Sequence, residues 1–293
     1  MKSKKNKERA WYILFTAPLI VIFFLVEIIP FFLGVGYSFF SWDGLPLNPM
    51  VFVGFNNFIR LFHDSRFMSA AGHTIVFTIF SVVLVNVVGL IFALLGTSRL
   101  TGHTAARTML FMPYLIGGLI LGYIWKFILG DALAAVGKAT GWTGFFFNWL
   151  SHPKTALLAM IIVNCWQMAG YIMIIYITGI QAIPDDVIEA AQVDGASFWQ
   201  TLFKVKFPLL MPSFTICLFM TLSNCFKIYD VNLSLTGGGP ASSTEMFAMN
   251  IFNEIFDMSN YGYGQAKAFV FFIIIAVVAL IQVSTTRRKE VEL

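Results

Sequence analysis

Residues 181–212 read QAIPDDVIEAAQVDGASFWQTLFKVKFPLLMP, and this stretch joins two long apolar runs. Pro184 fits the first turn of a helix, where its missing N–H leaves no hydrogen bond unmade. Asp185 and Asp186 favour the same turn, because negative charge is stabilised at the N-terminal end of a helix dipole. We expect this helix to end near Gly195, since glycine readily takes the left-handed conformation that follows many helices.

A second short helix is predicted directly after that glycine. Ser197 and Gln200 have the spacing of a capping box, in which each side chain bonds the other residue's backbone N–H. Pro208 then opens the next apolar run. Residues 181–207, which we call the elbow, therefore have the pattern of a helix–turn–helix, with an ordinary connecting loop on the membrane surface as the alternative.

The composition of the whole chain indicates an integral membrane protein. Of the 293 residues, 58% are hydrophobic and only 12% are charged, with a mean hydropathy of +0.79. Soluble domains carry about 25% charged residues, and a soluble core could not hide so much apolar surface. The composition excludes a soluble enzyme, a secreted disulfide scaffold and a disordered chain. The three cysteines and four scattered histidines predict neither a disulfide framework nor a metal site.

Six runs without charged residues are long enough to cross a bilayer as helices, which takes about 20 mostly apolar residues. They are Ala10–Val26, Phe67–Ser98, Thr108–Trp125, Thr155–Pro184, Phe207–Phe226 and Ala268–Thr286. None alternates with the period of two that a barrel strand requires. We therefore predict an all-α, polytopic membrane protein with six transmembrane helices.

The distribution of Lys and Arg predicts which ends of these helices face the cytoplasm. With the N-terminus inside, the inner segments hold twelve of the nineteen basic residues: Lys2, Lys4, Lys5, Lys7, Arg9, Arg99, Arg107, Lys204, Lys206, Arg287, Arg288 and Lys289. The others lie on outer or boundary segments: Arg60, Arg66, Lys126, Lys138, Lys154, Lys227 and Lys267. This excess follows the positive-inside rule, and six crossings return the chain to its starting side. We expect both termini in the cytoplasm.

The same pattern predicts the order of the segments along the chain. A cytoplasmic N-terminal segment (1–10) precedes a first transmembrane helix (11–40) and a partly irregular extracytoplasmic loop (41–72). A transmembrane domain (73–286) contains the elbow, and a cytoplasmic tail (287–293) follows it. The outer segment 130–154 has a weak helical pattern around Ala132–Ala139.

Polar side chains within the apolar runs are candidates for a transport pathway, because such groups are costly in lipid and usually face a bundle interior or a cavity. The candidates are Tyr114, Gln167, Tyr171 and Asn224. Asn164 shares a helix face with Gln167 and Tyr171. Amides and aromatic rings suit a sugar, but amides also join membrane helices to one another, and interfacial aromatic residues commonly serve as belt anchors. Lys227 and Asp230, three residues apart, could simply pair with each other.

Glu27 is an isolated acidic residue in the first run, three residues before Pro30. We place it near the outer end of that run, without an acidic partner, and favour a structural or snorkelling role over a proton site. Gly237–Gly239 is no phosphate loop, since it lacks the Lys-Ser/Thr ending and follows no predicted strand.

Two parts of the sequence together resemble the permease subunits of ABC importers, and specifically the maltose-type, binding-protein-dependent sugar permeases. The elbow resembles the family's EAA motif through Gln181-Ala182-Ile183-Pro184, Glu189-Ala190-Ala191, Asp194-Gly195-Ala196, Phe207-Pro208 and Pro212. The second part is Leu235-Thr236-Gly237-Gly238-Gly239-Pro240. The resemblance covers about residues 72–288, and it departs from the family at Phe207, where Leu is usual.

The resemblance implies a type I ABC importer permease fold, the import of a carbohydrate and a set of partners. The elbow would be a coupling helix in a cleft of an ATPase subunit, through Glu189, Ala190, Ala191, Asp194 and Gly195. Gly237, Gly238, Gly239 and Pro240 would lie where an extracytoplasmic sugar-binding protein docks. The other partners would be a second homologous permease, two ATP-binding subunits that hold ATP and Mg, and the lipid of a bacterial cytoplasmic membrane.

The chain itself is then expected to bind no cofactor, metal or nucleic acid and to catalyse no reaction. Two other classes of protein stay open as alternatives. An ion- or proton-coupled secondary transporter would need paired intramembrane carboxylates or an inverted repeat, and a membrane-embedded enzyme would need clustered His, Asp or Glu. The sequence distinguishes neither the sugar nor a sugar from a glycerol-phosphate substrate.

Overall fold

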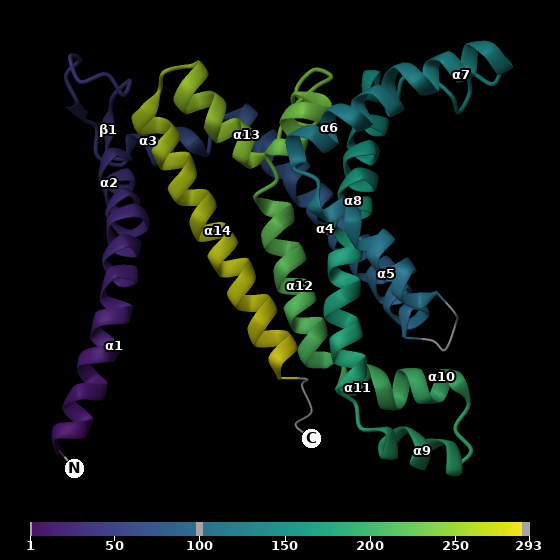
Figure 1. Ribbon diagram of the computed structural model, residues 1–293. Helices are drawn as coiled ribbons and strands as arrows, with labels where there is room; N and C mark the ends of the chain where they lie inside the picture. The colour runs from purple at the N-terminus through teal and green to yellow at the C-terminus, as the bar shows by residue number, and fades with distance from the viewer. Residues whose placement is uncertain (1, 98–101, 289–293) are drawn as a thin grey trace. The chain divides into compact units, whose positions relative to one another are not determined.

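The computed structural model describes residues 2–97 and 102–288, so Ser98, Arg99 and residues 289–293 of the predicted tail lie outside the described residues. The chain divides into two units, Met1–Asp64 with Ile251–Phe272 and Ser65–Asn250 with Ile273–Leu293. We call them the first and the second unit. Helices make up most of both, which confirms the predicted all-α class (Figure 1).

The first unit begins with one long helical run. Its elements are α1 (Lys2–Phe23), the π-turn η1 (Phe24–Ile28), α2 (Ile29–Tyr37), β1 (Phe40–Ser41), β2 (Val51–Phe52) and α3 (Asn56–Leu61). The π-turn accommodates Pro30, which has no N–H to give to the preceding turn. The apolar helix therefore extends over Trp11–Tyr37, and Glu27 lies well inside it rather than near its end.

The predicted irregular loop after this helix is more ordered than expected. The antiparallel strands β1 and β2 pair Phe40 with Phe52. The Asn57 side chain at the start of α3 donates to the carbonyls of Ser38 and Phe40, both at 2.9 Å. These bonds fix α3 to the hairpin, because a buried amide must find partners.

The second unit is built around three helices, α4 (Ser65–Gly96), α8 (Pro153–Gln181) and α12 (Met211–Phe226). A buried polar chain joins them: the Tyr176 hydroxyl donates to Asn86 Oδ1 at 2.8 Å, and Asn86 Nδ2 donates to Thr221 Oγ1 at 3.0 Å. Gly89 lets α4 approach α8 closely, since a Cβ there would lie 2.8 Å from the Ile172 side chain. Small residues and interhelical hydrogen bonds are the usual means of packing helices in lipid.

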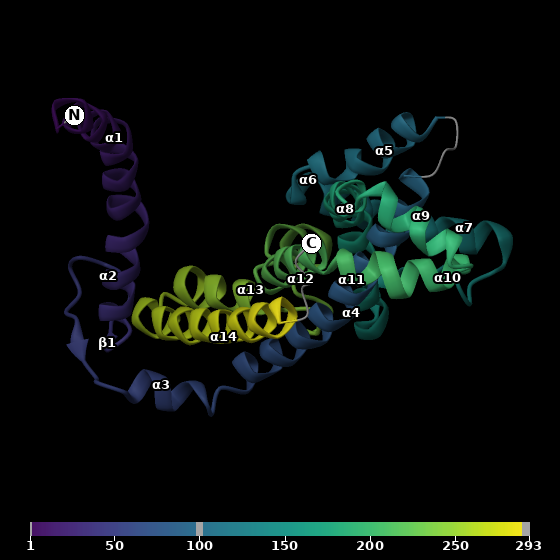
Figure 2. The same ribbon diagram turned by 90° about the horizontal axis from the view of Figure 1, so that it is seen from below.

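Around these three helices lie shorter elements of the second unit (Figure 2). They are α5 (His103–Phe111), η2 (Met112–Leu115), α6 (Gly118–Lys126), η3 (Phe127–Ala132), α7 (Leu133–Thr140), η4 (Trp149–Ser151), α9 (Asp185–Val193), α10 (Phe198–Gln200), η5 (Thr201–Lys206), α11 (Phe207–Leu209) and η6 (Asn232–Thr236). Three further elements, α13 (Phe247–Phe252), η7 (Asn253–Asp257) and α14 (Tyr261–Arg287), complete the chain. The helical pattern read around Ala132–Ala139 is confirmed by α7.

The third predicted crossing, Thr108–Trp125, is wrong as a single helix. Ile116 and Gly117 are extended, with ψ of 125° and 139°, and they separate η2 from α6. The preceding Pro113 lies in a 3-10 turn and cannot donate the hydrogen bond that would continue α5. The apolar helix long enough to cross a membrane is instead Gly118–Thr140.

The fifth predicted crossing begins later than expected. Residues Phe198–Leu209 and Met211–Phe226 meet at a bend of 70° next to Leu210, so Pro208 lies before the bend, in α11, and Pro212 opens α12. Among the described residues, five helices are long and apolar enough to cross a membrane, or six when this bent pair forms one crossing. The predicted count of six requires that bent crossing.

Candidate functional site

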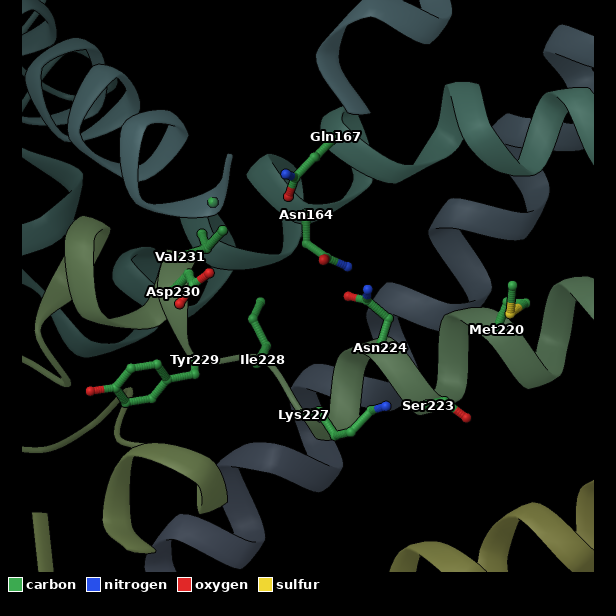
Figure 3. A pocket seen from close by; sticks show the side chains of 11 residues that line it. Asn164, Gln167, Met220, Ser223, Asn224, Lys227, Ile228, Tyr229, Asp230 and Val231 are labelled. Carbon is green, nitrogen blue, oxygen red and sulfur yellow. The ribbon is translucent and has the colours of Figure 1, made fainter. Parts of the chain in front are cut away.

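A polar pocket of about 410 Å³ lies in the second unit, between α6, α8, α12 and the segment that leads into η6. Figure 3 shows the side chains that line it. They are Gly118, Asn164, Gln167, Met220, Ser223, Asn224, Lys227, Ile228, Tyr229, Asp230 and Val231. The pocket combines amides, a hydroxyl and two opposite charges, a set that can exchange hydrogen bonds with a hydroxylated ligand.

Three side-chain amides line the pocket, and they differ in burial and in the hydrogen bonds that they already form. Asn164 is buried in α8, and its Nδ2 lies 3.5 Å from Cys225 Sγ. Gln167 Nε2 donates to the carbonyl of Ile116 at 3.0 Å, a carbonyl that the break before α6 leaves without a helical partner. Asn224 is exposed, and its amide faces that of Asn164 across the pocket (Figure 3). Asn224 is therefore the amide most available to a ligand.

The two charged residues of the pocket do not pair with each other. Lys227 follows the last residue of α12, and its φ and ψ of −93° and 10° start a non-helical segment. The helical neighbour geometry that would bring Lys227 to Asp230 is therefore absent. Both side chains are exposed, and neither forms an ion pair with any residue that the structure describes. One cation and one anion are thus available to a ligand.

The two predicted tyrosines of the pathway lie together but do not line this pocket. Tyr114 in η2 and Tyr171 in α8 stack with ring centroids 4.4 Å apart and an interplanar angle of 13°. Of the four predicted pathway residues, the pocket thus brings together Gln167 and Asn224. Ser223, inside α12, and Tyr229, beyond the end of α12 at Phe226, also line it.

The elbow has the helix–turn–helix form that the sequence predicts. Its first helix, α9, begins one residue after Pro184 and ends in a left-handed turn at Gly195, where φ is +77°. The N–H of Gly195 donates to Gln192 and that of Ala196 to Ala191, both at 3.0 Å, which forms a Schellman motif.

The second half of the elbow begins at the predicted capping box. The N–H of Ser197 donates to Gln200 Oε1 at 2.8 Å, and the N–H of Gln200 donates to Ser197 Oγ at 3.4 Å. These bonds give two otherwise unpaired backbone donors a partner. The left-handed turn at Gly195 and this capping box therefore set the change of chain direction between the two helices.

The solvent-exposed surface of the elbow is available to a partner. Four acidic side chains there are exposed and form no ion pair within the described part of the chain: Asp185, Asp186, Glu189 and Asp194. Two apolar side chains beside the turn are also exposed, Val193 at 87% and Phe198 at 67%. Ala190 and Gly195 are exposed as well, and Ala191 is half-buried. A surface that joins acidic, small and apolar side chains is suited to protein contact.

The glycine segment forms a tight turn after η6. Gly237 and Gly238 have φ of +58° and +81°, which L side chains rarely adopt. The Thr244 hydroxyl donates to the carbonyl of Gly239 at 2.7 Å and closes the turn. Gly237 is exposed, Gly238 is buried, and Gly239 and Pro240 are half-buried.

Comparison with known proteins adds an independent finding. Residues 86–290 match the family of binding-protein-dependent transport system inner membrane components. Over 294 aligned residues the chain is 45% identical to the "Probable starch degradation products transport system permease protein AmyD" of Thermoanaerobacterium thermosulfurigenes, covering 100% of this chain and 99% of that protein. It is 36% identical to the multiple sugar-binding transport system permease protein MsmF of Streptococcus mutans, covering 98% of each.

A solved structure has the same fold. It is a bacterial ABC transporter involved in the import of the acidic polysaccharide alginate, with a TM-score of 0.79 over 98% of this chain and 99% of that chain. The two sequences are 20% identical, so this likeness concerns the fold alone.

Proposed function

The chain belongs to the family of binding-protein-dependent transport system inner membrane components, and we propose that it is the permease subunit of an ATP-driven ABC importer for a carbohydrate. The observation that carries this proposal is the identity of 45% and 36%, over almost the whole chain, to two permeases of sugar transport systems. The starch-related name of the first favours malto-oligosaccharides as the substrate.

The polar pocket is the proposed point of sugar contact. Asn224 supplies a free amide, Lys227 an ammonium group and Asp230 a carboxylate, and all three groups are exposed in a cavity of about 410 Å³. A sugar hydroxyl both donates and accepts hydrogen bonds, so it can use the anion and the cation at once. The stacked Tyr114 and Tyr171 are proposed to line the pathway beside the pocket.

The elbow is the proposed contact with an ATPase subunit. Its exposed surface is acidic and apolar, and it fits a cleft that carries basic and apolar groups. The side chain of Ala190 is small and exposed, so a partner surface can approach closely there. Closure of that cleft on ATP would move α9 and, through the bend next to Leu210, would reorient α12 beside the pocket. ATP and Mg would be bound by the ATPase subunits and not by this chain.

The remaining partners follow from the same proposal. A second, homologous permease would complete the pathway, because the described residues of one chain offer at most six crossings. A sugar-binding protein would dock outside, at the turn of Gly237–Pro240. The elbow and both termini would then lie in the cytoplasm of a bacterial cell, where the basic residues of the inner segments favour them.

Purification of the tagged chain in mild detergent tests this assembly. We expect a soluble ATPase to purify with it, and the ATP hydrolysis of the complex to rise when the sugar-loaded binding protein is added. A stable lone chain that takes up sugar by itself would contradict the proposal and would favour a secondary transporter.

A further inference from the structure

An apolar groove of about 400 Å³ lies in the second unit, between the C-terminal half of α4 and residues 198–210, which comprise the second half of the elbow and the start of the next run. Every side chain that lines it is apolar: Val87, Leu90, Ile91, Leu94, Leu95, Phe198, Trp199, Leu202, Phe203, Phe207 and Leu210. This groove is distinct from the polar pocket, with which it shares no lining residue.

The groove continues an exposed apolar stripe along α4. Side chains at helical spacing form this stripe, each at least 42% exposed: Val76, Phe80, Val83, Val87, Ile91 and Leu95. In a helix that crosses a membrane, such a stripe is suited to contact with lipid chains. The groove is therefore open to the same apolar surroundings as the stripe.

The wall that the elbow contributes has the character of an interfacial helix. The Trp199 and Phe203 rings stack with centroids 5.9 Å apart, and both side chains are at least 60% exposed. Leu202, which lines the same groove, is buried. Aromatic residues gather where a membrane meets water, and an amphipathic helix at that level lies in the membrane surface.

Two lysines stand on this same segment. Lys204 is exposed and Lys206 half-exposed, and neither forms an ion pair with a described residue. Lys206 lies beside the groove, since its carbonyl accepts from the N–H of the lining residue Leu210 at 2.9 Å. The acidic residues of the elbow lie in α9 or, in the case of Asp194, directly after it, and Figure 1 shows α10 between α9 and the long helices of this unit.

We propose that this groove binds one acyl chain of an anionic glycerophospholipid, with Lys204 and Lys206 at its phosphate. A single lipid molecule fits both the groove and the lysines. Its acyl chain would fill the apolar groove, and its negatively charged headgroup would pair with the two ammonium groups. The bound lipid would brace the elbow against α4 and so keep the ATPase contact in place. This inference rests on the proposed orientation, in which the elbow lies at the cytoplasmic surface.

Photo-crosslinking of the assembled transporter in nanodiscs tests the proposal in the unaltered protein. Phosphatidylglycerol and phosphatidylcholine would each carry the same photoreactive acyl chain, and labelled peptides would be mapped by mass spectrometry. We expect phosphatidylglycerol to label the segments 87–95 and 198–210 more than about fivefold above phosphatidylcholine, since one basic residue near an anionic surface has about that effect. Equal labelling by the two lipids, or none in these segments, would overturn the proposal.

Matched variants separate the headgroup contact from the chain contact. The double variant Lys204→Gln, Lys206→Gln should lose the preference for phosphatidylglycerol, whereas Lys138→Gln, on the exposed surface of α7, should keep it. Ile91→Trp should fill the groove and reduce labelling by both lipids. Val83→Trp, on the same stripe but outside the groove, should not.

A competing occupant is tested at the same position. If Ile91 replaced by a photoreactive phenylalanine analogue captures another subunit and not lipid, the groove is a protein interface and the proposal is wrong. Sugar uptake by the same preparations tests the importer function separately from the lipid site. ATP-driven uptake with no lipid preference would overturn only the lipid site.

Discussion

Lys267 is a charged residue with no exposed surface, and the sequence placed it at the edge of an apolar run. Its Nζ lies 2.7 Å from a carboxylate oxygen of Glu254 and 2.9 Å from one of Asp64. The Tyr263 hydroxyl donates to the same Asp64 oxygen at 2.8 Å, and the Arg60 guanidinium lies 4.1 Å from the centre of the Tyr263 ring. These contacts join α3, η7 and α14 within the first unit.

Removal of this ammonium group should destabilise the protein strongly. Lys267→Met leaves two carboxylates close together without their shared cation, and breaking a buried pair in this way costs about 3 to 5 kcal/mol. We expect a clearly lower Tm for the purified complex in detergent. Lys138→Met removes an exposed lysine with no described ion-pair partner, and its Tm should stay unchanged. Equal Tm values for the two variants would contradict this role for Lys267.

Asn224, unlike Lys267, is a polar residue whose side chain holds no part of the fold together. Its side chain is exposed, and no described residue forms a hydrogen bond with it. Asn224→Ala should leave the Tm unchanged but lower kcat/KM for sugar uptake about tenfold, because a ligand hydrogen bond of about 1.4 kcal/mol is lost. Uptake assays over a range of sugar concentrations measure this change. Wild-type kinetics in this variant would remove Asn224 from the pathway.

At the scale of the elements, close packing of α5 on α8 depends on one glycine. A Cβ at Gly170 would overlap the Leu110 carbonyl and lie 2.9 Å from the Phe111 Cα, so backbone atoms would have to move. Gly170→Ala should therefore cost about 1 to 3 kcal/mol, as overpacking does. Gly72→Ala in α4 is the matched control, because nothing lies within 4 Å of its Cβ position, and it should be neutral or slightly stabilising. Thermal unfolding of the two variants, with no difference between them, would refute this account.

The left-handed turn of the elbow allows a test of coupling. Gly195→Asp places a side chain where φ is +77°, so it should distort the turn, keep the protein inserted and uncouple ATP hydrolysis from sugar uptake. Gly141→Asp imposes nearly the same strain at φ +76° in the turn after α7, far along the chain from the elbow. The ratio of sugar imported to ATP hydrolysed should fall only in Gly195→Asp. Normal coupling in that variant would contradict the role of the elbow.

Across the whole molecule, the sequence predicted those features that depend on neighbouring residues, namely helices, caps and turns. The apolar runs mark most of the long helices, and the Ser197–Gln200 box and Gly195 mark the elbow, because caps and turns are decided by a few neighbouring residues. Apolarity continues across Ile116 and Gly117, so the hydropathy pattern predicted one helix where the chain in fact breaks after Pro113. Hydropathy measures transfer into lipid and is insensitive to such a change of direction.

Contacts between distant segments could not be predicted in this way. The ion cluster of Lys267 joins residues that are about 200 positions apart in the chain. Likewise, the pocket depends on where α12 ends, and a helical spacing argument placed Tyr171 beside Gln167 without showing that the Tyr171 ring stacks on Tyr114. The sequence indicated candidate residues by their side-chain chemistry. Which of them lie together could be seen only in the folded structure.

The central claim is that this chain imports a carbohydrate with energy delivered from ATP through the elbow. Uptake of a labelled malto-oligosaccharide into proteoliposomes that hold the complete transporter, with its binding protein outside, tests it most directly. We predict uptake only when ATP is supplied on the side of the elbow, and no loss when ionophores collapse proton and sodium gradients. Uptake that continues without ATP and follows an ion gradient would contradict the account.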